Sequence, residues 1–174
     1  MRITKRKQPF TSNFFLDNSV LEEVNEFRDL GITTDRHLSW NLHIDKVAAK
    51  ANRMLGLIKR TCRDFDDRKT LRTLYRALVR SHLEYCSLIW SPYTKTNVEK
   101  LEKVQRRVTK FILKTEDCYD SHLKKLNLLM LSLKKRRLLT DATLLYKVLH
   151  GLFDIDIERY VDFHKETDRF SFRQ

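Results

Sequence analysis

The sequence predicts a mainly helical protein in which an N-terminal β-hairpin is followed by a helical bundle of four to five helices. The chain has 174 residues but only three glycines and two prolines, and a fold of many short strands would need more turn residues. Hydrophobic residues make up 41% of the chain, which is enough for a packed core. After Ser39 the spacing of apolar residues changes from two to about 3.6, the period of an α-helix.

The first segment of the chain is predicted to form strands. Apolar residues over 13–16 and 20–24 flank a polar turn at 17–19, which is typical of a β-hairpin. A third strand is predicted over 27–32, where Gly31 indicates a bulge or a close approach of the backbone.

The apolar spacing then predicts helices over residues 41–63, 67–92, 95–114, 120–126 and 132–150. Ser39 or Asn41 can cap the first helix, because short polar side chains accept hydrogen bonds from the unpaired N–H groups there. Asp66 or Asp67 can cap the second helix, Pro92 ends it, and Gly151 is well placed just beyond the last one. The second helix is predicted to bury Leu71, Leu74, Tyr75, Leu78, His82, Tyr85 and Ile89.

Positive charge is the clearest functional signal. The formal net charge is +12, and most of it lies in the central part of the chain, which favours a polyanionic partner. Lysines and arginines recur every three or four residues, so that they share one face of a helix. A five-residue row on the third predicted helix consists of Lys100, Lys103, Arg107, Lys110 and Lys114. A four-residue row on the second consists of Lys69, Arg72, Arg76 and Arg80.

Such rows can also be ordinary solvated helix faces. Glu99 can pair with Lys103, but one flanking acid against five bases leaves the five-residue row poorly neutralised, which favours binding to phosphates. Trp40, Trp90 and Tyr93 could stack on bases, although both tryptophans are predicted to belong to the core.

No catalytic residue, metal ligand or cofactor is predicted. The three glycines are too far apart for a phosphate-binding loop. The adjacent Asp66 and Asp67 are interpreted as a helix cap between basic residues rather than as metal ligands. His82 and Cys86 are four residues apart on a helix and could face a zinc ion, but no second pair with ligand spacing lies nearby.

The location of the chain is predicted from its cysteines and its hydropathy. Three widely spaced cysteines do not indicate a disulfide framework, so we expect a reducing intracellular compartment, with nucleus and cytoplasm both open. No apolar run is long enough to span a membrane, so a membrane is not expected as a partner.

Seven short motifs carry a resemblance to a known family. They are FRDLGI (27–32), LSWNLHI (38–44), KANRMLG (50–56), LVRSHLEYC (78–86), IWSPY (89–93), LEKVQRR (101–107) and LLYKVLHG (144–151). In this order and spacing they resemble the region beyond the polymerase palm in non-LTR retrotransposon reverse transcriptases of the jockey and chicken-repeat type.

The resemblance implies three parts. Residues 1–40 would be an end-of-palm-like β-hairpin segment near the primer grip, residues 41–151 a helical thumb-like domain, and residues 152–174 a C-terminal tail. Such a thumb grips the primer–template duplex, so both basic rows are expected to contact an RNA–DNA hybrid, which proteins recognise mostly by shape.

The family's catalytic carboxylates lie in a Phe/Tyr-Ala-Asp-Asp motif that this sequence does not contain. Because Met1 falls within the family's palm, the resemblance implies a non-catalytic fragment of an RNA-directed DNA polymerase, with Mg²⁺ bound only in the palm. Two alternatives stay open. The chain could be part of an active polymerase whose palm is encoded separately and is a protein partner, or it could be an inert helical interaction module.

Overall fold

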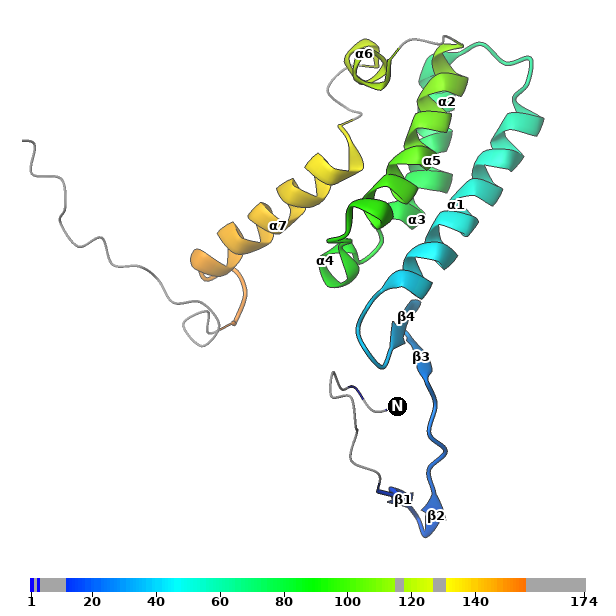
Figure 1. Cartoon of the computed structure of the whole chain (residues 1–174). Helices are drawn as coiled ribbons and strands as arrows, with labels where there is room; N and C mark the ends of the chain where they lie inside the picture. The colour runs from blue at the N-terminus through cyan, green and yellow to red at the C-terminus, as the bar shows by residue number, and fades with distance from the viewer. Residues whose placement is uncertain (2, 4–11, 115–117, 127–130, 156–174) are drawn as a thin grey trace, which may run out of the picture. The chain divides into compact units, whose positions relative to one another are not determined.

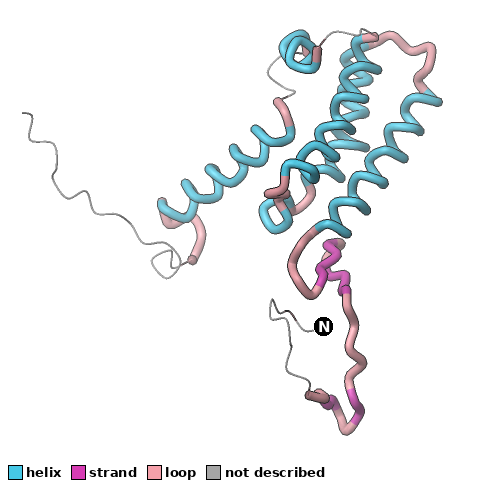
Figure 2. The backbone as a smooth tube through the Cα atoms, viewed as in Figure 1, coloured by secondary structure: helices cyan, strands magenta, loops and turns pink. Residues whose placement is uncertain are grey.

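The computed structural model describes residues 1, 3, 12–114, 118–126 and 131–155. Within them the protein is mainly helical, with antiparallel strand pairs followed by a helical bundle, so the predicted fold class is confirmed (Figures 1 and 2). The chain divides into two units, Met1–Arg137 and Leu138–Gln174. Most of the predicted tail, from residue 156 onward, lies outside the described residues.

The strands form two hairpins in succession. Strand β1 (Phe15–Leu16) pairs with β2 (Ser19–Val20), as predicted, and β3 (Glu26–Asp29) pairs with β4 (Ile32–Asp35). The predicted single strand over 27–32 with a bulge at Gly31 is wrong, because β3 ends at Asp29 and Gly31 lies in the two-residue turn before β4. Its φ is +86° and that of the preceding leucine is +45°, and two successive positive φ angles suit the tight turns that match strand twist.

Helix α1 (Asn41–Thr61) and helix α5 (Lys95–Leu113) agree with the first and third predicted helices. At the start of α5, the Thr94 hydroxyl accepts a hydrogen bond from the Asn97 N–H. The predicted cap of α1 is wrong, because the N-cap position is Trp40 and no side chain caps it. Ser39 instead donates its hydroxyl proton to Asp35, which ties the strand end to the helix start.

The second predicted helix is divided by a π-helical turn. It consists of α2 (Arg68–Leu74), the π-helical segment η1 (Tyr75–Arg80) and α3 (Ser81–Glu84). It ends before Pro92, because Cys86 adopts a left-handed φ of 49°, and the single turn α4 (Ser87–Trp90) follows.

The π-helical turn changes which residues of this helix are buried. The buried residues are Leu71, Tyr75, Val79 and Leu83, four apart, rather than the set expected from a period of 3.6. A π-turn closes its hydrogen bonds over five residues, so the buried face moves by one position beyond it. Leu78, predicted to be buried, is therefore exposed. Tyr85 and Ile89, also predicted to be buried, are exposed because they lie beyond the end of α3, where the chain leaves the helix.

The core of the first unit is centred on α5. Its apolar flank packs against α1 and against the helix of α2, η1 and α3, which lie side by side in Figure 1. Trp90 is fully buried, as predicted, and its indole N–H donates to the Tyr85 carbonyl at 2.8 Å. Trp40 is only half-buried against the core.

Helix α6 (Tyr119–Lys125) and the first turn of α7 (Leu133–Leu149) cover another side of α5. The buried Glu102 accepts hydrogen bonds from the Tyr119 hydroxyl at 2.7 Å and from the Lys134 N–H at 2.9 Å. Burial and the Glu102 charge raise the pKa of Tyr119, which therefore stays protonated as the donor. These two hydrogen bonds attach the start of α6 and the start of α7 to α5.

The second unit contains the rest of α7 and its C-terminal cap. Gly151 has a φ of +66°, its N–H bonds to the Val148 carbonyl, and the Leu152 N–H bonds to the Lys147 carbonyl. This arrangement is a common way to end a helix, and it confirms the predicted position of Gly151.

The π-helical turn predicts an unequal effect of two identical substitutions in the same helix. Leu83 is 0% exposed and Leu78 is 38% exposed, although the helical period predicted Leu78 to be buried. We expect Leu83→Ala to lower the free energy of unfolding by about 2–5 kcal/mol, because it leaves a cavity. Leu78→Ala should cost less than about 1 kcal/mol. Urea unfolding followed by circular dichroism measures both, and equal losses would contradict the shifted face.

Candidate nucleic-acid interface

The five-residue row lies along the flank of α5 that faces away from the core. Leu101, Val104, Val108 and Ile112 are buried on the opposite flank. From Lys100 to Lys114 the row covers fourteen residue steps, about 21 Å at the helical rise of 1.5 Å per residue. Its four C-terminal members are exposed and Lys100 is half-buried, so the whole row belongs to one surface.

Several members of this row form ion pairs or hydrogen bonds with residues of α1 or of the segment that follows α1. Lys100 pairs with Asp45 at 2.6 Å, and Arg107 donates to the Asn52 side-chain oxygen at 3.0 Å. At the far end Lys114 pairs with Asp66, and this hydrogen bond and charge lower the pKa of the Asp66 carboxyl. The Asp66 carboxyl therefore stays ionised at neutral pH.

The predicted pairing of Glu99 with Lys103 is wrong. Glu99 lies two turns from Arg106 and holds its guanidinium through two hydrogen bonds of 2.6 and 3.2 Å. The planar guanidinium matches both carboxylate oxygens, which an ammonium group cannot do. Within the described part of the chain, Lys103 makes no ion pair, and it lies in the middle of the row.

The bridges between the two helices show that α1 and α5 run in parallel. Asn97 donates to Asn41 at 2.7 Å at the helix starts, and the Lys100–Asp45 and Arg107–Asn52 contacts follow at matching steps. Lys59 of α1 therefore lies beside the five-residue row. We call α1–α5 face the surface formed by this row together with Lys59.

The sequence alone did not connect Lys59 with the row. No local pattern gives the partner of a helix, although Asp45 and Asn52, spaced by two turns, were a usable signal. Lys59 marks the contact, since its ammonium lies 5.8 Å from the centre of the Phe111 ring on α5.

The arginines of the four-residue row lie near the end of α6 and the start of α7. Arg72 donates to the Leu126 carbonyl, and Arg80 pairs with Glu84, which also holds Arg136. Arg76 is half-buried, and its Nε lacks a hydrogen-bond partner among the described residues. Burial and the three neighbouring arginines lower the pKa of Arg76. The nine predicted residues are thus divided between two places in the unit.

The other candidate sites have structural roles. Asp67 accepts hydrogen bonds from the N–H groups of Lys69 at 3.0 Å and Thr70 at 3.2 Å, so its interpretation as a cap is confirmed. Over the ranges that the structure describes, no three His, Cys, Asp or Glu side chains form a group that could hold a metal ion. All three cysteines are free of disulfides. None of the described helices has the length and apolar character needed to cross a bilayer.

Comparison of the chain with protein-family models, curated proteins and solved structures gave no significant match. The functional interpretation therefore depends on the chain's own residues and their geometry.

Because the ion pair between α1 and α5 is exposed, we expect its removal to change the stability of the fold only slightly. Both side chains of the Lys100–Asp45 pair are about half exposed, and such pairs contribute at most about 1 kcal/mol. We expect Asp45→Asn to change the free energy of unfolding, measured in urea, by no more than that. A larger loss would mean that the pair stabilises the bundle and that Lys100 is not available for another anion.

Proposed function

We propose that this chain binds the phosphate backbone of a nucleic-acid duplex through the α1–α5 face, as a non-catalytic, thumb-like part of a non-LTR retrotransposon reverse transcriptase. The observation that carries the proposal is the five-residue row, which offers five cations on one exposed flank of α5. Among the ion pairs of the described residues, those of Asp45 and Asp66 involve the two ends of the row, Lys100 and Lys114.

The dimensions of the row suit a nucleic-acid strand. One strand of a duplex carries a negative charge about every 3.4 Å along the axis, so a row about 21 Å long extends past about six phosphates. Each cation placed near a phosphate releases a condensed counterion, which favours binding at low salt. Contacts of this kind position a protein without reading bases, as expected of a surface that follows a moving duplex.

The type of duplex comes from the resemblance of the motifs over residues 27–151. It favours an RNA–DNA hybrid, whose shape differs from that of B-DNA. Catalysis is not proposed for the chain alone, because phosphoryl transfer needs metal ions held by carboxylates and the Ala-Asp-Asp motif of the family is missing from the sequence. The adjacent Asp66 and Asp67 are engaged with Lys114 and with a helix start.

A second candidate function is a polymerase completed by a separately encoded palm. The observation that favours it is the apolar surface of the first hairpin. Its exposed residues are Phe14, Phe15, Leu16, Val20, Leu21 and Val24. A patch of this kind on a small hairpin suits coverage by another protein surface.

Charge reversal within the row tests the proposed interface. We expect the triple variant Lys103→Glu, Arg107→Glu, Lys110→Glu to bind a short RNA–DNA hybrid more weakly in filter binding. Its plot of log affinity against log salt should be shallower by about 2–3 units, because three phosphate contacts are lost at about 0.9 each.

The matched control reverses three exposed lysines that lie on α6 and at the start of α7, namely Lys124, Lys134 and Lys135. It changes the net charge equally, and it should keep the slope of the unchanged protein. An equal loss of hybrid affinity in both variants would mean that only the net charge of the protein matters, and not the position of the row. Binding of the unchanged protein no stronger than that of a neutral protein would favour the inert module.

Primer extension separates binding from catalysis. We expect no nucleotide incorporation when the chain is incubated with a primer–template, Mg²⁺ and deoxynucleotides, because the chain lacks the family's metal-binding carboxylate motif. A complete reverse transcriptase on the same template is the positive control. Incorporation that persists after purification to homogeneity would contradict the non-catalytic proposal.

A further inference from the structure

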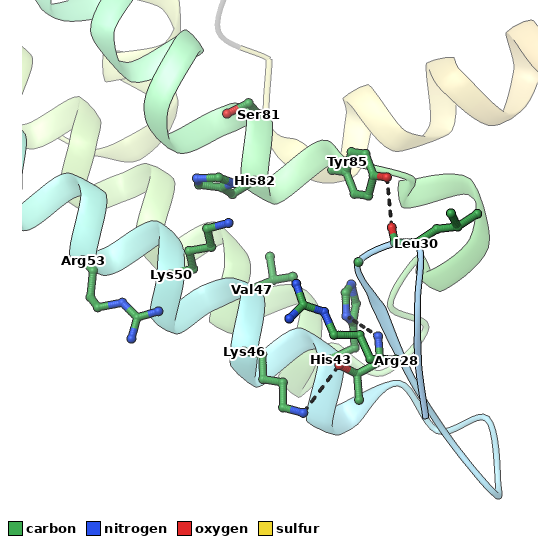
Figure 3. A pocket seen from close by; sticks show the side chains of 12 residues that line it. Arg28, Leu30, His43, Lys46, Val47, Lys50, Arg53, Ser81, His82 and Tyr85 are labelled. Carbon is green, nitrogen blue, oxygen red and sulfur yellow. Dashed lines mark hydrogen bonds between the residues drawn. The ribbon is translucent and has the colours of Figure 1, made fainter. Parts of the chain in front are cut away.

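A pocket of about 560 Å³ lies between the β3–β4 hairpin, α1 and the end of the η1–α3 helix (Figure 3). Arg28 reaches into it from β3, and Lys46, Lys50 and Arg53 line it from α1 at helical spacing. His82 and Tyr85 form the wall on the side of α3. The volume is in the range of small-molecule sites and is much larger than a single phosphate needs.

The charge of the pocket is uncompensated. No Asp or Glu is among the residues that line it. Lys46 pairs with Glu26 at 3.3 Å outside the pocket. In the part of the chain that the structure describes, Arg28, Lys50 and Arg53 form no ion pair. Three cations that line one hollow without an acid among the lining residues indicate an anionic ligand.

The walls are held in place by bonds between elements. The Tyr85 hydroxyl donates to the Leu30 carbonyl at 3.0 Å, which fastens the hairpin turn to the end of α3. The Thr33 N–H donates to His43 Nδ1 at 3.2 Å, which fastens β4 to α1. Burial and the Lys46 charge lower the pKa of His43, so its ring is neutral and can accept this bond. The pocket is therefore formed before any ligand binds.

The walls also offer groups for the rest of a ligand. Figure 3 shows Lys50 directed toward His82, and burial together with the Lys50 charge lowers the pKa of this histidine. A neutral His82 ring can donate one hydrogen bond and accept another. The Tyr85 ring is 53% exposed, and a flat aromatic face at a pocket wall can stack on a nucleobase.

We propose that this pocket binds a nucleotide, with Arg28, Lys50 and Arg53 around the phosphate and the base against Tyr85. The nucleotide is either free or the phosphorylated end of a strand, because both present the same phosphate and base. The site is distinct from the α1–α5 face: its cations lie on the other side of α1 and on β3, so it does not depend on the duplex interface.

Calorimetric titration of the full chain with deoxyadenosine monophosphate tests the proposal, with adenosine as the ligand without phosphate. We expect the monophosphate to bind and adenosine to bind at least about tenfold more weakly, because hydrogen bonds between charged groups carry the affinity. The double variant Lys50→Gln, Arg53→Gln should lose at least about tenfold in affinity for the monophosphate.

The control variant Lys134→Gln, Lys135→Gln removes the same charge at two exposed lysines outside both the pocket and the α1–α5 face, and its affinity should stay within about twofold. Amide NMR shifts on addition of the monophosphate should centre on His82, Tyr85 and the turn at Gly31. Equal binding of adenosine, an equal loss in the control, or shifts centred elsewhere would each overturn the proposal.

The source of the nucleotide is decided with a short single strand that carries either a 5′-phosphate or a 5′-hydroxyl group. Tighter binding of the phosphorylated strand than of the monophosphate assigns the site to strand ends, and the reverse order assigns it to free nucleotides. Loss of hybrid binding by the Lys103, Arg107 and Lys110 variant with retention of monophosphate binding would show that the two sites are independent.

Discussion

The parallel packing of α1 against α5 is the constraint on which the rest of the first unit depends. Apolar residues of both helices join one core, and polar bridges from Asn41–Asn97 to Asn52–Arg107 fix how far one helix is displaced along the other. This packing places Lys59 of α1 beside Phe111 of α5. Lys59 and the five-residue row therefore form one surface, which neither helix determines alone.

Much of the helical part could be predicted from sequence because its signals are local. The apolar period located α1 and α5, and the cap expected at Asp66 or Asp67 located the start of α2. The π-helical turn at Tyr75–Arg80 could not be predicted, because a search at period 3.6 assumes a regular helix. The turn at Leu30–Gly31 was missed because only one of its two residues with positive φ is a glycine.

The candidate sites depend even more on contacts between residues that are far apart in the sequence. The five-residue row is a pattern within one helix, so its common face was visible in the sequence, whereas its partners on α1 are about 55 residues away. The pocket gave no sequence signal at all. Arg28 comes from a strand and Lys50 from a helix, and they line one hollow only because hydrogen bonds from Tyr85 and His43 hold the hairpin in place.

The two basic rows differ in what a phosphate would have to displace. At the five-residue row the competitor of a phosphate is an exposed pair such as Lys100–Asp45, which is weak in water and easily exchanged. At the four-residue row, Arg80 and Arg136 share the half-buried Glu84, and Arg76 is half-buried beside them. Moving these groups toward a ligand would leave a carboxylate without partners in a partly desolvated place, which is costly. A duplex therefore has a lower barrier to binding at α5, and the arginines of η1 are better explained as part of the contact with the start of α7.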